Sequence, residues 1–276
     1  MRTDKNMRFG IGSYTYAWAI GVPGFPAPPN PLDAFRLLDR TVGFGLSVVQ
    51  ICDNLPLTDL AERDLQAFAE RAFSAGVHIE IGTRGIDETN LRQYLALARR
   101  FRSPFVRVVI DRGSDEPSPE ETVRRLRPLV AAFAAENVVL ALENHDRFPA
   151  DILADIVERL GPETVGICLD TVNSFGSLEG PDVVIPTLAP YAVNLHIKDF
   201  SIRRATHNMG FLIEGQPAGQ GRLNIPELLT SLPKCQTAIL ELWTPYQETI
   251  ARTVALEAQW ADESVIYLKS LLPSPA

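Results

Sequence analysis

The sequence predicts an α/β protein, a single (β/α)8 TIM barrel that spans residues 1–276. Short apolar runs alternate with longer amphipathic stretches, and no composition break or low-complexity linker divides the chain. The apolar runs are rich in Val, Ile and Leu and mostly continuous, which is typical of parallel strands covered on both faces. Eight strand-plus-helix units in succession favour a closed barrel, and a doubly wound open sheet is the alternative.

Eight apolar runs are expected to form the barrel strands. They span residues 8–13, 47–51, 77–81, 105–110, 138–143, 165–170, 192–196 and 238–242.

Amphipathic stretches between these runs are expected to form the helices, at residues 32–42, 59–75, 88–101, 151–160 and 249–269 and from Ser118 onward. Thr58 and Asp87 are candidate N-caps, and Ser118-Pro119-Glu120-Glu121 has the pattern of a capping box with proline at the first helical position. Segments 21–30, 172–180 and 199–223 are expected to be irregular. Long connections after barrel strands often carry function.

Composition and charge exclude several classes of protein. The formal net charge of −8 argues against a protein that binds nucleic acid through its phosphate backbone. No run approaches the ~18 consecutive apolar residues of a membrane span. The three cysteines are widely spaced, so we expect buried thiols in a reducing compartment, and a cytoplasmic protein.

Four ionisable residues lie at the ends of the later strand runs: Glu143, Asp170, His196 and Glu241. Barrel strands deliver their C-terminal residues to one mouth, so these side chains should converge. Three close carboxylates repel one another unless a proton or a cation lies among them. Oxygen ligands with one imidazole suit Mn²⁺ or Mg²⁺, whereas any one of these residues alone could be a helix cap or a core residue.

Basic and polar residues near the same strand ends are candidates for substrate binding. Lys198, Arg203 and Arg84 could bind a carboxylate or a hydroxyl; the alternatives are an ion pair of Lys198 with Asp199 and a solvated Arg203. Asn144 and His145 follow Glu143 and could contact substrate or orient the metal ligands.

Two further features of the seventh connection are interpreted as structural. The glycine-rich segment 215–221 lacks a Walker lysine and is interpreted as a loop turn, which disfavours a phosphorylated substrate. His207 lies in a long loop and is expected at the surface.

The strand-end motifs resemble those of the xylose isomerase-like TIM-barrel superfamily, in particular its sugar phosphate isomerase/epimerase-type members. The motifs are Leu142-Glu143-Asn144-His145, Cys168-Leu169-Asp170-Thr171, His196-Ile197-Lys198-Asp199, Gly219-Gln220-Gly221 and Leu240-Glu241. The resemblance implies that Glu143, Asp170, His196 and Glu241 are the metal ligands. A multi-zinc endonuclease of the same superfamily is disfavoured because the chain has only four histidines and a net charge of −8. The intact quartet argues against a non-catalytic sugar-binding barrel.

The chain departs from the ketose-epimerase pattern at two positions. Asn173 stands where those enzymes have a substrate-binding histidine three residues after the aspartate ligand, and residues 146–149 contain no second glutamate. A neutral amide can bind a hydroxyl but cannot shuttle a proton, so epimerisation by two bases is disfavoured.

Other segments resemble a narrower branch, the 3-oxo-isoapionate decarboxylases of apiose catabolism. They are residues 10–16, 49–56 and 170–175, and Lys198-Asp199-Phe200 with Arg203. The resemblance implies a divalent-metal-dependent carboxy-lyase that converts a 3-oxo sugar acid, through a metal-stabilised enediolate, into a ketose and CO2. A metal-dependent sugar isomerase or epimerase is the alternative function.

This interpretation assigns a role to each candidate residue. Glu143, Glu241 and Lys198 are expected at the reacting centre, and the expected substrate-binding residues are Asn173, Arg203, Arg84, Asn144 and His145. The expected partner is a small sugar acid or ketose rather than nucleic acid or a membrane, and a homo-oligomer is compatible with the sequence.

Overall fold

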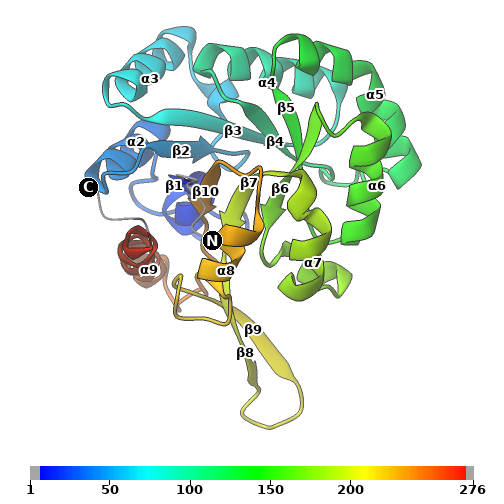
Figure 1. The fold of residues 1–276 in the computed structure, drawn as a ribbon. Helices are drawn as coiled ribbons and strands as arrows, with labels where there is room; N and C mark the ends of the chain where they lie inside the picture. Colours follow the sequence, from blue (N-terminus) through cyan, green and yellow to red (C-terminus); the bar gives the residue numbers. More distant parts are fainter. Residues whose placement is uncertain (1–6, 272–276) are drawn as a thin grey trace.

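The computed structural model describes residues 7–271 and has a closed eight-stranded parallel barrel at its centre (Figure 1). The closed sheet confirms the predicted (β/α)8 barrel and excludes the open doubly wound sheet; residues 1–6 and 272–276 of the predicted domain lie outside the described part. The strand order is β1-β10-β7-β6-β5-β4-β3-β2. The barrel strands are β1 (Arg8–Gly12), β2 (Val48–Ile51), β3 (His78–Arg84), β4 (Phe105–Val109), β5 (Val139–Glu143), β6 (Val165–Asp170), β7 (Ala192–Ile197) and β10 (Thr237–Leu240).

Helices cover the outside of the barrel (Figure 1), and most strand residues are buried. They are α1 (Ala17–Ile20), α2 (Ala34–Gly43), α3 (Glu62–Ser74), α4 (Glu88–Phe101), α5 (Pro119–Ala135), α6 (Ala150–Leu160), α7 (Pro181–Leu188), α8 (Ile225–Ser231) and α9 (Ile250–Ser270). None of the helices within residues 7–271 is long and apolar enough to cross a bilayer.

The helix starts follow the predicted caps with two corrections. Asp87 caps α4 and Ser118 caps α5 as predicted, each accepting a backbone N–H from the first turn. Thr58 is not the cap of α3, because Leu57–Asp59 forms a 3-10 turn and the helix begins at Glu62. The Glu121 carboxylate binds Arg124 and Arg125 instead of completing a capping box.

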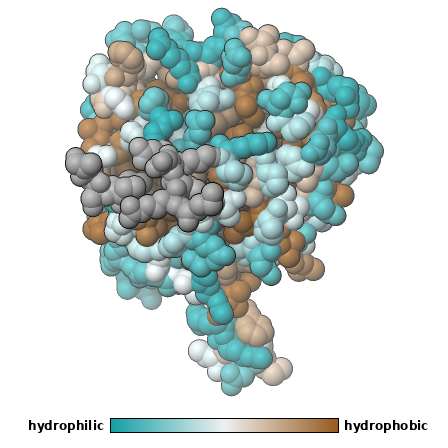
Figure 2. Space-filling view, viewed as in Figure 1, coloured by the Kyte–Doolittle hydropathy of each residue, from teal (hydrophilic) through white to brown (hydrophobic). Residues whose placement is uncertain are grey.

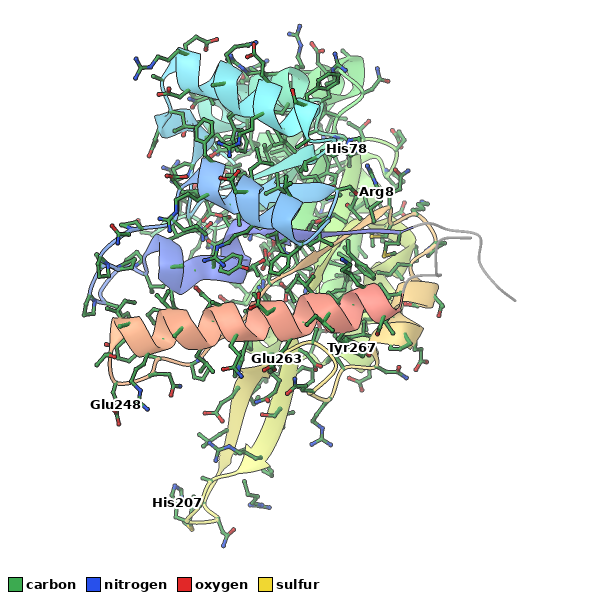
Figure 3. All side chains as sticks on the ribbon, turned by 90° about the vertical axis from the view of Figure 1, so that its left-hand side faces the viewer. Arg8, His78, His207, Glu248, Glu263 and Tyr267 are labelled. Carbon is green, nitrogen blue, oxygen red and sulfur yellow. The ribbon has the colours of Figure 1, made fainter. Side chains whose placement is uncertain are left out.

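The segment expected to be irregular at residues 199–223 contains an antiparallel hairpin of β8 (Asp199–Arg204) and β9 (Phe211–Gln216). The hairpin projects from the barrel beside α7 and α8 (Figures 1 and 2), and His207 lies at its far end (Figure 3). The outer half of the hairpin is exposed, so its residues lack the apolar/polar alternation that signals a half-buried strand. Exposed His207 agrees with the expected surface position.

Candidate active site

Four predicted side chains meet at the C-terminal mouth of the barrel. Glu143 and Asp170 end β5 and β6, His196 lies in β7 opposite Asp170 in register, and Glu241 follows β10. All four are at most 1 % exposed. The Nδ1 atom of His196 lies 3.2 Å from Glu241 Oε1, 3.4 Å from Glu143 Oε2 and 3.8 Å from Asp170 Oδ2. The strand ends therefore bring the quartet together as the sequence predicted.

The donor atoms of the quartet fit a divalent cation. His196 Nδ1 and Glu241 Oε1 are buried and have no hydrogen-bond partner among residues 7–271, although they lie only 3.2 Å apart. Two unpaired acceptors at this distance are unfavourable unless a proton or a cation lies between them. Asp170, His196 and Glu241 offer ligand atoms within 4.8 Å of one another, and the oxygen-rich set suits Mn²⁺ or Mg²⁺.

Gln50 on β2 fixes the tautomer of His196. The Gln50 Nε2 group donates to Glu80 and Asn194, so its Oε1 faces His196 Nε2 at 2.7 Å. An acceptor at this position favours a proton on Nε2 and leaves the Nδ1 lone pair directed toward the carboxylates. Gln50 is thus a positioning residue that the sequence analysis did not identify.

We expect Gln50→Leu to weaken Mn²⁺ binding by about 10- to 100-fold, because the substitution removes the acceptor that orients His196. Isothermal titration of metal-stripped protein measures this change, and thermal unfolding checks that the variant is folded. Gln93→Leu, which replaces an exposed glutamine on α4, should bind Mn²⁺ as the parent does. Equal affinity of Gln50→Leu and the parent would contradict the positioning role.

Glu80 lies inside the barrel behind Gln50 and carries a perturbed carboxyl group. Burial raises its pKa from 4.5 to about 7, although Gln50 donates a hydrogen bond to it. The folded state therefore holds the proton more tightly than the unfolded chain. This contribution to stability is greatest at low pH and is lost as pH rises from about 4.5 toward 7.

Accordingly, Glu80→Gln should become progressively more stable than the parent as pH rises. The difference in unfolding free energy should grow by about 2–3 kcal/mol between pH 5 and pH 8. Urea unfolding of the metal-stripped proteins at both pH values measures it, with Glu120→Gln, at an exposed position on α5, as control. A difference that does not change with pH would show that Glu80 does not titrate in this range.

Lys198 points into the barrel mouth rather than pairing with Asp199. Its Nζ atom lies 2.7 Å from Asp170 Oδ2 and 2.9 Å from Glu241 Oε2, and it donates to Asn173 Oδ1. Burial lowers the pKa of Lys198, but Asp170 and Glu241 outweigh burial and raise it well above its usual value. Lys198 therefore stays protonated beside the quartet.

Asp199 instead closes the glycine-rich turn. Its carboxylate accepts backbone N–H groups of Gly219, Gly221 and Leu223 at 2.9–3.0 Å. Gly219 has φ +84°, and a Cβ there would meet the Tyr267 ring of α9 (Figure 3). An internal carboxylate thus occupies the amides that a phosphate could have used, which agrees with the predicted loop turn.

A second ionic cluster, which the sequence analysis missed, lies beside Glu143. Arg107 is 2 % exposed on β4; its Nε donates to Glu143 and its Nη1 to Asp53 at 2.8 Å. Asp53 also accepts from Arg84 Nε at 3.2 Å and from the Tyr14 hydroxyl at 3.0 Å. Burial opposes ionisation of Asp53 and Glu143, but Arg107 and the other cationic and hydrogen-bonding neighbours together outweigh it. The pKa of Asp53 is therefore lowered, and that of Glu143 falls to about 2.

Both clusters open into a cavity of about 410 Å³. Its lining includes Arg84, Arg107, Glu143, His145, Asn173, Lys198 and Glu241, with Trp18 and Trp243. Asn173 donates to Glu143 Oε1 at 2.8 Å. A larger groove of about 1160 Å³ lies between α7, β8 and α8 and contains none of the quartet.

Two predicted substrate-binding residues are not brought to this cavity. Asn144 is buried, and its amide bonds the backbone of Asp170 and the Ser174 hydroxyl, so it positions a predicted ligand. Arg203 lies on the projecting hairpin and pairs with Glu214. The sequence placed it near the mouth because the hairpin, which carries it away from the barrel, was not predicted.

The three cysteines agree with the expectation of buried thiols. Cys52, Cys168 and Cys235 are all buried, and no disulfide joins them in the described part of the chain. Burial raises the pKa of both Cys52 and Cys168 well above its ordinary value.

A family model described as xylose isomerase-like TIM barrel matches residues 38–271. The chain belongs to the xylose isomerase-like family. The chain is 32 % identical over 271 residues to a 3-oxo-isoapionate decarboxylase of Pectobacterium atrosepticum, and the alignment covers 97 % of each of the two chains.

Solved structures with the xylose isomerase-like fold superpose on most of the chain. A D-psicose 3-epimerase from Clostridium cellulolyticum H10 is 15 % identical. It superposes with a TM-score of 0.69 over 96 % of this chain and 98 % of the epimerase chain. A xylose isomerase-like protein from Mycobacterium smegmatis in complex with magnesium is also 15 % identical, with TM-score 0.66 and coverage of 97 % and 100 %. These likenesses agree with the barrel fold.

Proposed function

We propose that this protein is a divalent-metal-dependent decarboxylase of a small 3-oxo sugar acid, such as 3-oxo-isoapionate. The observation that carries the proposal is the convergence of an oxygen-rich quartet with three cationic side chains on one small cavity. The full-length likeness to a 3-oxo-isoapionate decarboxylase supports the same reaction. A cytoplasmic location and a homo-oligomer stay predictions.

Decarboxylation of a 3-oxo acid breaks the bond between the carboxylate carbon and C2. The electron pair moves toward the 3-oxo oxygen, and C2 then takes up a proton to give the ketose. When bound, a divalent ion supplies Lewis-acid stabilisation for the negative charge that develops on the oxygen. Glu143, Asp170, His196 and Glu241 would hold this ion, with Mn²⁺ or Mg²⁺ as the preferred metals.

The other side chains fit a reaction that starts without a base. Asn173 occupies the position of the epimerase histidine and bonds both Glu143 and Lys198, so it holds these groups rather than moving a proton. Lys198 presents a protonated ammonium beside Asp170 and Glu241. We assign to it the stabilisation of the developing oxyanion and the supply of a proton.

Proton NMR in D2O tests the proposal. Two preparations, the enzyme loaded with Mn²⁺ and diluted to limit line broadening, and the metal-stripped enzyme, are each incubated with 3-oxo-isoapionate and with a panel of ketoses. We expect metal-dependent conversion of the acid into a deuterated ketose, and no interconversion of ketoses. Loss of ketose C–H signals without reaction of the acid would instead identify an isomerase or epimerase.

A further inference from the structure

Two arginines form a second polar centre in the cavity, joined to the predicted metal ligands only through the ion pair of Arg107 with Glu143. Arg84 and Arg107 come from β3 and β4 and share the carboxylate of Asp53, which follows β2. We infer that they form the subsite that binds the substrate carboxylate, with Arg84 as the contacting residue and Asp53 as a positioning residue. The inference rests on the proposed function, because it assigns the acid group of that substrate.

The hydrogen bonds of this cluster leave Arg84 available to a ligand. Its Nε is held by Asp53, whereas its terminal nitrogens have no hydrogen-bond partner within residues 7–271. Its side chain is 31 % exposed and lines the cavity. Guanidinium nitrogens in a fixed plane match the two oxygens of a carboxylate.

Arg107 and Tyr14 hold the cluster in place. Arg107 is buried, bonds Asp53 and Glu143, and lies over the Tyr14 ring at 5.6 Å. Asp53 accepts from Tyr14, Arg84 and Arg107, so its charge is compensated by three donors. A carboxylate ligand therefore meets a cationic surface rather than the bare Asp53 anion.

The charge balance of the cavity favours a monoanion. Four carboxylates, Asp53, Glu143, Asp170 and Glu241, face the cations Arg84, Arg107 and Lys198. Counted as formal charges, the four carboxylates and three cations sum to −1, and a divalent ion would change the sum to +1. A singly charged sugar acid neutralises this site, whereas a neutral ketose leaves one positive charge unpaired.

The reaction itself predicts how Arg84 should act. The carboxylate loses its charge as neutral CO2 departs, and negative charge develops instead at the 3-oxo oxygen. Interactions with the carboxylate therefore stabilise the bound acid at least as much as the transition state. Removing such an interaction should raise KM while kcat changes little.

The test compares Arg84→Gln with the parent, both loaded with Mn²⁺. Calorimetry measures the binding of threonate, a four-carbon sugar acid, and of erythrulose, a neutral four-carbon ketose. Arg84→Gln should weaken threonate binding by about 10- to 100-fold and leave erythrulose and Mn²⁺ binding within about threefold. The KM for 3-oxo-isoapionate should rise by a similar factor, with kcat within about threefold.

Arg92→Gln, an exposed arginine on α4 that pairs with Glu88, is the matched control and should bind threonate as the parent does. Unchanged threonate binding in Arg84→Gln, or equal weakening of threonate and erythrulose, would overturn the subsite. If threonate binding depends on Arg84 but no CO2 is released from 3-oxo-isoapionate, the proposed function fails while the carboxylate subsite stands.

Discussion

Glu241→Gln is expected to lower kcat/KM by about a thousandfold, because a divalent ion contributes several kcal/mol of charge stabilisation. Glu241 Oε1 faces His196 Nδ1 at 3.2 Å, and neither atom has a hydrogen-bond partner in the described part of the chain. The amide keeps the size of the side chain but removes one negative charge from the quartet. Titration with Mn²⁺ should show affinity at least about tenfold lower.

The choice of Glu241 avoids the buried ion pair of Arg107 with Glu143, whose loss would destabilise the fold. Glu248→Gln, an exposed residue that pairs with Arg252, serves as control and should keep full activity. Thermal unfolding confirms that both variants are folded. Parent-like Mn²⁺ affinity in Glu241→Gln would remove Glu241 from the set of ligands.

Lys198→Met should have opposite effects on metal binding and catalysis. The ammonium competes with a metal for the oxygens of Asp170 and Glu241, so its removal should tighten Mn²⁺ binding. Loss of a protonated group beside the reacting centre should lower kcat by about a hundredfold. Calorimetric titration of the metal-stripped variant with Mn²⁺ measures the affinity. Steady-state kinetics on the Mn²⁺-loaded variant measure kcat.

Lys234→Met, at an exposed position, is the control for loss of a lysine. A parent-like kcat in Lys198→Met would exclude Lys198 from the reacting centre. Weaker Mn²⁺ binding would show that the ammonium supports the quartet instead of competing with a cation for it.

The convergence of the strand-end residues could be predicted from the sequence because barrel topology directs the C-terminal ends of all strands to one mouth. Each of Glu143, Asp170, His196 and Glu241 ends an apolar run, and the structure brings all four together. The parallel sheet also follows from the continuous apolar runs. Neither result requires knowledge of a particular side-chain contact.

Polar residues inside the strands were missed because strand-end topology gives no information about them. Gln50, Glu80 and Arg107 interrupt the apolar runs of β2, β3 and β4, and their side chains are buried. A polar residue within a continuous apolar run requires a buried partner, and this signal could have identified all three. Their partners lie on other strands, so no local pattern could name them.

The outward position of Arg203 depends on the projecting hairpin, whereas Lys198 enters the barrel mouth as predicted. Lys198 and Asp199 are adjacent in sequence, yet one enters the barrel mouth and the other closes the Gly219 turn. Arg203 follows the same strand but is carried outward by β8. The start of the hairpin immediately after β7 decides all three positions.

Release of CO2 from 3-oxo-isoapionate, followed while Mn²⁺ is titrated into metal-stripped enzyme, tests the central claim most directly. We expect almost no release at first and a rise that reaches its plateau at one equivalent of metal per chain. Full CO2 release by the enzyme in excess chelator would contradict the metal-dependent decarboxylase.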